Sequence, residues 1–285
     1  MNYRELRVPP PLDALVECVW FLTASAPHDT ADEQRILPDG CVELVCHLDG
    51  RFLSVSPDGR RSPQSSFALV GLLTAPIVVQ PAGRAETMGV RFRPGCAYLF
   101  FPCPLAGLTD RSVSLEDLWG ARARDLWEQL AAASGDAARA HLIGRVLLDR
   151  LARVVPDRVT AYAVGELVRS AGRSSVGALA ARTGVTARHL QRRFDAHVGA
   201  SPKVLARILR FQNTLRRRGL RPEGRTDWVR VAVECGYSDQ SHLIRDYAAF
   251  AGNTPASLIA AEGELSSYFT SPQRLAALFD GRRYG

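Results

Sequence analysis

GVTARHLQRRFDAHVGASP, from Gly184 to Pro202, decides the fold of the C-terminal half of this chain. The opening glycine favours a turn, and Leu190 and Phe194 then follow four positions apart, which places both on one face of a helix. The opposite face carries three side chains that suit base edges: Arg188, Gln191 and Arg192. A short apolar pattern (Val176, Leu179, Ala180) leads into the glycine. The stretch therefore predicts a helix-turn-helix unit.

The unit is repeated further along the chain. Leu190, Arg192, Phe194, Gly199 and Pro202 recur 53 residues later as Leu243, Arg245, Tyr247, Gly252 and Pro255. Gly184 recurs 52 residues later as Gly236, so the second turn is one residue longer. A long helical pattern that opens at Ser201-Pro202 joins the two units. Two units in register predict a tandem helix-turn-helix domain.

The repeated units resemble the DNA-binding domain of the AraC/XylS family of bacterial transcription regulators. The resemblance covers about Pro156 to Leu258. Three stretches carry it: HLQR at His189–Arg192, CGYSDQSH at Cys235–His242 and GNTP at Gly252–Pro255. It implies that one chain reads two major-groove segments about one DNA turn apart. It also implies double-stranded promoter DNA as partner, with RNA polymerase and a second copy of the chain as further candidates.

Residues that contact bases follow from their positions in the two motifs. By resemblance to family members on DNA, Arg188, Gln191 and Arg192 are the base-contact candidates of the first unit. Gln240, Ser241 and Arg245 face outward in the second unit. The candidates for DNA backbone contact are His189, Arg193 and His242, with solvent exposure or packing as the alternatives. For Asp239 an N-cap role is favoured over reading cytosine.

Basic charge is concentrated in the same half of the chain. Residues 157–258 hold 17 Arg or Lys against 8 Asp or Glu, whereas residues 1–156 hold 16 against 18. A basic surface displaces counterions from phosphate, although a solvated arginine-rich face would have the same composition. Arg216, Arg217 and Arg218 at the end of the connecting helix fit either phosphate contact or helix capping.

The N-terminal half reads as short strands separated by Gly and Pro turns. Six strands are expected: Glu17–Leu22, Cys41–Leu48, Arg51–Val55, Ser66–Leu73, Ile77–Gln80 and Glu86–Phe92. Such spacing predicts a small antiparallel barrel or sandwich. The resemblance implies a cupin-like barrel that binds an unknown small-molecule effector. The predicted fold class is therefore α+β with two domains, the second an all-α domain of about seven helices.

Three residues of the N-terminal half are candidates for effector binding. Glu43 and His47 share one face of the Cys41–Leu48 strand, where a solvent-facing pair is the alternative to a pocket. Arg91 and its neighbour Arg93 would suit an anionic effector, or serve as edge-strand charges without a binding role. Neither a metal nor another cofactor is expected. The six cysteines form no CxxC pair, which favours free thiols over a structural zinc site, and nothing in the pattern supports catalysis.

Helices follow the strands. Ser114 is a candidate N-cap for a helix to Trp127, and a second helix begins near Asp136; these two make either a dimer contact or the contact between barrel and DNA-binding domain. Val155-Pro156 marks a boundary. The expected divisions are 1–113, 114–156, 157–258 and a 259–285 tail with one amphipathic helix. The longest apolar run, Phe67–Val79, is too short to span a bilayer, so a cytoplasmic protein is expected.

Overall fold

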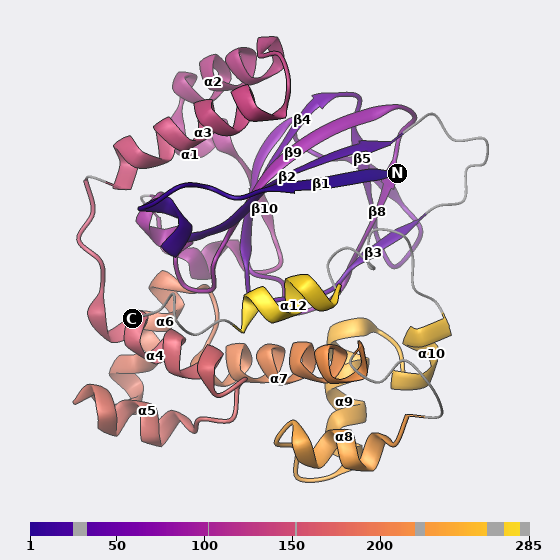
Figure 1. Cartoon of the computed structure of the whole chain (residues 1–285), viewed down its shortest axis with the longest axis vertical. Helices are drawn as coiled ribbons and strands as arrows, with labels where there is room; N and C mark the ends of the chain where they lie inside the picture. Colours follow the sequence, from indigo (N-terminus) through magenta and orange to yellow (C-terminus); the bar gives the residue numbers. More distant parts are fainter. Residues whose placement is uncertain (25–32, 102, 152, 220–225, 261–270, 280–285) are drawn as a thin grey trace.

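The computed structural model describes residues 1–24, 33–101, 103–151, 153–219, 226–260 and 271–279 (Figure 1). Within these residues the strands lie between Asn2 and Ser114, with the short 3-10 helices η1 Leu12–Ala14, η2 Ala97–Leu99 and η3 Leu105–Leu108 among them, and the α-helices follow. The expected α+β architecture with a β-rich N-terminal domain and a helical C-terminal domain is confirmed.

The strands form two antiparallel sheets rather than one closed barrel. The larger sheet has the order β1-β2-β9-β4-β7-β10, with bounds β1 Asn2–Leu6, β2 Val16–Ala24, β4 Val42–Asp49, β7 Phe67–Val70, β9 Ala85–Phe92 and β10 Ser112–Ser114. The smaller has the order β3-β8-β5-β6, with bounds β3 Gln34–Ile36, β5 Phe52–Val55, β6 Arg61–Pro63 and β8 Ile77–Pro81. All six expected strands form. Of the other four, β3, β6 and β10 have three residues each, too few to show a period-2 pattern in the sequence, and the five-residue β1 was not expected.

Both faces of the larger sheet are covered, because alternate residues of its central strands β2, β4 and β9 enter different apolar clusters. One face, with Leu44, Met88 and Phe21, joins the main core of the molecule. The other face, with Trp20, packs toward Phe52 and Val79 of the smaller sheet. Trp20 pairs across the strands with Gly89, where a Cβ atom would lie 2.3 Å from the indole ring. Gly89 therefore provides the space that the indole occupies.

Three helices cover the outer face of the larger sheet: α1 Leu115–Trp119, α2 Ala121–Ala132 and α3 Asp136–Leu151 (Figure 1). Ser114 caps α1, as expected, by accepting a hydrogen bond from the Glu116 amide. The single helix expected from Ser114 to Trp127 is wrong, because the chain breaks at Gly120, whose φ of 64° is not helical. Helices α1, α2 and α3 pack on the strand domain. The contacts between the strand domain and the DNA-binding domain come mostly from other elements.

Seven helices, all in the described part of the C-terminal domain, confirm the expected number. Their bounds are α4 Arg158–Arg169, α5 Val176–Thr183, α6 Ala187–His197, α7 Pro202–Gly219, α8 Trp228–Glu234, α9 Gln240–Ala251 and α10 Pro255–Ala260. Side chains of Asp157, Ser175, Thr186, Asp227 and Asp239 cap α4, α5, α6, α8 and α9. Residues 220–225, between α7 and α8, lie outside the described residues.

The expected tail helix is α12, Pro272–Leu278, which lies between the strands and α7 (Figure 1). Leu275 and Leu278 are buried there. Its Arg274 is also buried and pairs with Asp39 at 2.5 Å, with Glu17 at 3.3 Å from its Nε. The C-terminal tail thus ties the strand domain to the central helix of the DNA-binding domain. Tyr268 and Phe269 lie outside the described residues.

Candidate DNA-binding surface and interior pocket

The first recognition helix is α6. Gly184, in the left-handed conformation with φ 68°, ends α5, and the Thr186 hydroxyl accepts the His189 amide hydrogen bond that starts α6. Leu190 and Phe194 are fully buried. The three base-contact candidates differ in exposure: Arg188 and Arg192 are exposed and Gln191 is half-buried. The Gln191 amide donates to Asp195 Oδ1 at 2.7 Å, so base reading would require this bond to be exchanged.

The second recognition helix, α9, has the same design. The Asp239 carboxylate accepts from the His242 amide at 2.7 Å, and this hydrogen bond is the main cause that lowers the pKa of the Asp239 carboxyl. The expected N-cap role is thereby confirmed. Leu243 and Tyr247 face the core. The base-contact candidates Gln240, Ser241 and Arg245 are all exposed.

The three candidates for DNA backbone contact, His189, Arg193 and His242, are all half-buried. Arg193 forms an ion pair with Asp157, the residue that caps α4. His242 is half-buried, and its ring is nearly perpendicular to the Tyr237 ring at a centroid distance of 5.1 Å. His189 is half-buried at the first turn of α6. Arg193 therefore has a structural partner that the sequence pattern did not indicate.

Helix α7 fixes the two recognition helices relative to each other. Its apolar residues Leu205, Ile208, Leu209 and Phe211 are fully buried. Its Arg207 pairs with the buried Asp246 of α9 at 2.7 Å. At the end of α7, Arg216 lies over the Phe279 ring at 4.7 Å, and Arg217 is 3.9 Å from Glu234. Arg216 and Arg217 therefore already have partners within the protein.

The N-terminal domain contacts both recognition helices near their C-terminal ends. The Tyr98 ring stacks on His197, the last residue of α6, at a centroid distance of 4.3 Å. The Thr109 hydroxyl donates to the Gly199 carbonyl just beyond that helix. At α9, the Arg35 guanidinium donates to the Ala251 carbonyl at 2.7 Å. These contacts leave the N-terminal turns, which carry the base-contact candidates, uncovered.

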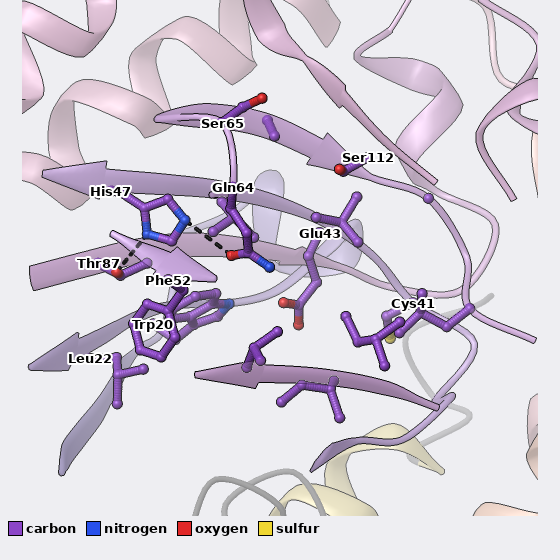
Figure 2. A pocket seen from close by; sticks show the side chains of 18 of the residues that line it. Trp20, Leu22, Cys41, Glu43, His47, Phe52, Gln64, Ser65, Thr87 and Ser112 are labelled. Carbon is purple, nitrogen blue, oxygen red and sulfur yellow. Dashed lines mark hydrogen bonds between the residues drawn. The ribbon is translucent and has the colours of Figure 1, made fainter. Parts of the chain in front are cut away.

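A pocket lies between the two sheets (Figure 2). Glu43 and His47 line it, together with residues that the sequence pattern did not single out: Trp20, Phe52, Gln64 and Thr87. The solvent-facing alternative for Glu43 and His47 is therefore wrong. The smaller sheet covers their face of β4, which the strand pattern alone could not reveal.

Arg91 lies behind the pocket wall rather than in it. Its side chain has no exposed surface and pairs with Glu43 at 2.6 Å, with Glu5 and Glu17 at 3.2 and 3.6 Å. The edge-strand alternative is wrong, because β9 lies between β2 and β4. The nearby carboxylates also oppose its expected use as a site for an anion. Arg93 is likewise buried, and its guanidinium donates to the Asp13 carbonyl.

His47 is neutral in this setting. Burial lowers the pKa of its imidazole to about 4. Nε2 is 3.2 Å from Gln64 Oε1, and Nδ1 is 2.9 Å from the Thr87 hydroxyl. Because the Gln64 oxygen can only accept, we assign the proton to Nε2 and let Thr87 donate to Nδ1. His47 therefore adds a fixed polar wall and no charge.

The cysteines are free thiols, five of them buried and Cys103 half-buried. Burial raises the pKa of each, so none is activated toward nucleophilic chemistry. The described residues contain no group of three potential metal ligands. Of the described helices, none is long and apolar enough to cross a membrane.

Comparisons with known proteins agree with the C-terminal site. A family model described as a helix-turn-helix domain matches residues 179–261, and a domain of unknown function, DUF6597, matches residues 4–114. No curated protein matches the chain.

Several solved structures of ToxT from Vibrio cholerae are similar to this chain. One has 9% identity and a TM-score of 0.46, covering 84% of this chain and 98% of that chain. ToxT bound to an unsaturated fatty acid has 11% identity and a TM-score of 0.42, covering 84% and 94%. ToxT bound to (E)-4-(8-methylnaphthalen-1-yl)but-3-enoic acid has 11% identity and a TM-score of 0.44, covering 90% and 99%.

The matched domain and the two capped recognition helices define a DNA-binding transcription regulator. Its C-terminal helix-turn-helix domain is of the AraC/XylS type, as the repeated motifs indicate.

Proposed function

We propose that the chain reads two successive segments of the DNA major groove, one with α6 and one with α9, and that a small molecule in the N-terminal domain controls this reading. Arg188, Gln191 and Arg192 contact bases in one segment, and Gln240, Ser241 and Arg245 in the other. His189, Arg193 and His242 lie beside the DNA backbone. The working divisions are 1–113, 114–156, 157–258 and 259–285.

One observation carries the DNA-reading proposal. Each recognition helix buries an apolar pair and turns a set of base-capable side chains outward on its first turns. The N-terminal turns of a recognition helix are the part that reaches base edges in a major groove. Arginine recognises guanine and glutamine recognises adenine by paired hydrogen bonds.

Selection of binding sites from random duplex DNA by the full-length protein tests the proposal. Enrichment of two short blocks about 10 base pairs apart supports two readers on one chain. Enrichment of one block alone would contradict the use of both helices. Retention without any enriched sequence, falling steeply with salt, would reduce the interaction to phosphate contact.

Control by an effector is supported by the contacts between the domains. The N-terminal domain holds the C-terminal ends of both recognition helices through Tyr98, Thr109 and Arg35. Asp39 lines the pocket and also pairs with Arg274 of α12, which packs on α7. A ligand that moves Asp39 therefore acts on α12, which contacts α7, the helix between the two recognition helices.

The chain acts by binding, without a catalytic step, in the cytoplasm of a bacterium. RNA polymerase and a second copy of the chain are its further partners. Exposed apolar side chains at the end of α3 and just beyond it, Leu148, Val154 and Val155, favour a contact between copies near this point. Sedimentation of the full chain with and without DNA distinguishes a dimer from a monomer.

A further inference from the structure

The cavity between the sheets has a distinct chemical character. Its volume is about 110 Å³, and Trp20, Phe52 and Val79 form an apolar end. The described residues that line it include two acids, Asp39 and Glu43, and no arginine or lysine. The basic groups nearest to them, Arg91 and Arg274, lie behind the wall with 0% and 2% of their side chains exposed.

The charged groups in and behind the pocket wall do not balance. Four carboxylates surround the two guanidiniums: Glu5, Glu17, Asp39 and Glu43. The Glu43 side chain keeps 18% of its surface exposed while its Oε1 accepts from Arg91 at 2.6 Å. Burial raises the pKa of the Glu43 carboxyl, Arg91 lowers it, and Asp39 raises it further. An added positive charge in the cavity would be attracted, and an added negative charge repelled.

A second polar feature lies at the apolar end. The Trp20 indole nitrogen is buried and has no acceptor among the described residues. Figure 2 shows that the indole nitrogen and the Glu43 carboxylate lie on facing sides of the pocket. The indole face also favours a nearby cation. The neutral indole N–H attracts an anion, but the Asp39 and Glu43 carboxylates repel it more strongly.

We propose that this cavity binds a small aromatic amine, with its protonated nitrogen beside Glu43 and Asp39 and its ring against Trp20 and Phe52. This ligand class rests on the effector control proposed above. At about 110 Å³ the cavity is smaller than an apolar cavity of roughly 150 Å³ that holds benzene, so it admits at most a single ring, and binding one requires side chains of the lining to move. The same carboxylates disfavour an anionic ligand.

Calorimetric titration of the full-length protein tests the ligand class. The three probes share a phenyl ring on a short chain and differ in the charge of the end group: phenethylamine, phenethyl alcohol and phenylacetate. The amine is expected to bind at least about tenfold more tightly than the other two, a difference that calorimetry resolves. Phenylacetate binding as tightly as the amine overturns the ligand class. So does the absence of binding by all three at millimolar concentration.

Two variants assign the site. Glu43→Gln should abolish the preference for the amine, because one of the carboxylates that balance the positive charge of Arg91 is lost. Asp58→Asn makes the same change of charge in an exposed turn and should leave the preference intact. Val45→Phe fills the cavity without altering a charge and should abolish binding of the amine, which keeps the test valid if Glu43→Gln does not fold. Unchanged amine binding by folded Val45→Phe would overturn the site.

Anisotropy of a selected DNA duplex, measured in the same samples, separates the two proposals. Amine binding that leaves the DNA affinity unchanged supports the ligand class and overturns effector control. Preferred binding of phenylacetate that shifts the DNA affinity overturns the ligand class and leaves effector control standing.

Discussion

Replacing Arg274 by leucine tests the link between the C-terminal tail and the strand domain. The Arg274 side chain is 2% exposed and contacts Asp39 and Glu17, which are 13% and 5% exposed. Leucine keeps the apolar packing of α12 beside the buried Leu275 but removes the positive charge. Arg91, which has several carboxylates of its own to balance, is then the nearest basic group.

The expected loss of stability follows from the burial of these groups. Removing one partner of a buried ion pair costs roughly 3–5 kcal/mol. Asp39 retains the Cys41 amide hydrogen bond at 2.8 Å and lies 4.0 Å from Arg91, which offsets part of the loss. We therefore expect the lower end, about 3 kcal/mol less free energy of unfolding at neutral pH.

Urea unfolding followed by tryptophan fluorescence measures this change. Arg145→Leu on the exposed surface of α3 is the matched control and should change stability by less than about 0.5 kcal/mol. In an Asp39→Asn background the cost of Arg274→Leu should fall by at least about 1 kcal/mol, because the two residues interact directly. A change at Arg274 no larger than at Arg145, or strict additivity with Asp39→Asn, would refute the proposed link.

Three further outcomes follow from the structure. Because burial lowers the folded-state pKa of His47 to about 4 while the unfolded imidazole titrates near 6.5, stability is full above pH 6.5 and decreases as the pH falls toward 4. The loss is about 2 kcal/mol at pH 5. Urea unfolding at pH 7.5 and 5 should show it, and His47→Gln should reduce this pH dependence. Phe194→Ala should cost about 3–5 kcal/mol in the same assay, since the ring is fully buried beneath α6; a loss below 1 kcal/mol would be inconsistent with that packing. Thr186→Ala should cost about 1 kcal/mol by removing the cap of α6, and Thr186→Ser should restore most of it.

The DNA-binding half could be predicted from sequence because its signals are local and repeated. Apolar spacing placed Leu190, Phe194, Leu243 and Tyr247 in the core, and the capping residues Thr186 and Asp239 fixed where α6 and α9 begin. The exposure of Arg188, Arg192 and Arg245 follows from the same periodicity. The assignment of base contacts to these residues remains a prediction.

The pocket could not be predicted because it depends on contacts between distant segments. Strand alternation put Glu43 and His47 on one face of β4, but only the second sheet determines whether that face meets solvent. Arg91 lies in a central strand because β2 and β4 pair on either side of β9, an order that local patterns do not encode. The docking of α12 likewise depends on Arg274 meeting Asp39, 235 residues away.

The most direct test of the central claim, that each recognition helix reads its own DNA segment, is site selection repeated with Arg192→Ala and Arg245→Ala. The first variant should lose sequence preference in one block and the second in the other, each at a cost of about 1–3 kcal/mol in affinity for the wild-type site. Loss of both blocks in either variant, or a selection profile unchanged from the wild type, would contradict the assignment of one block to each helix.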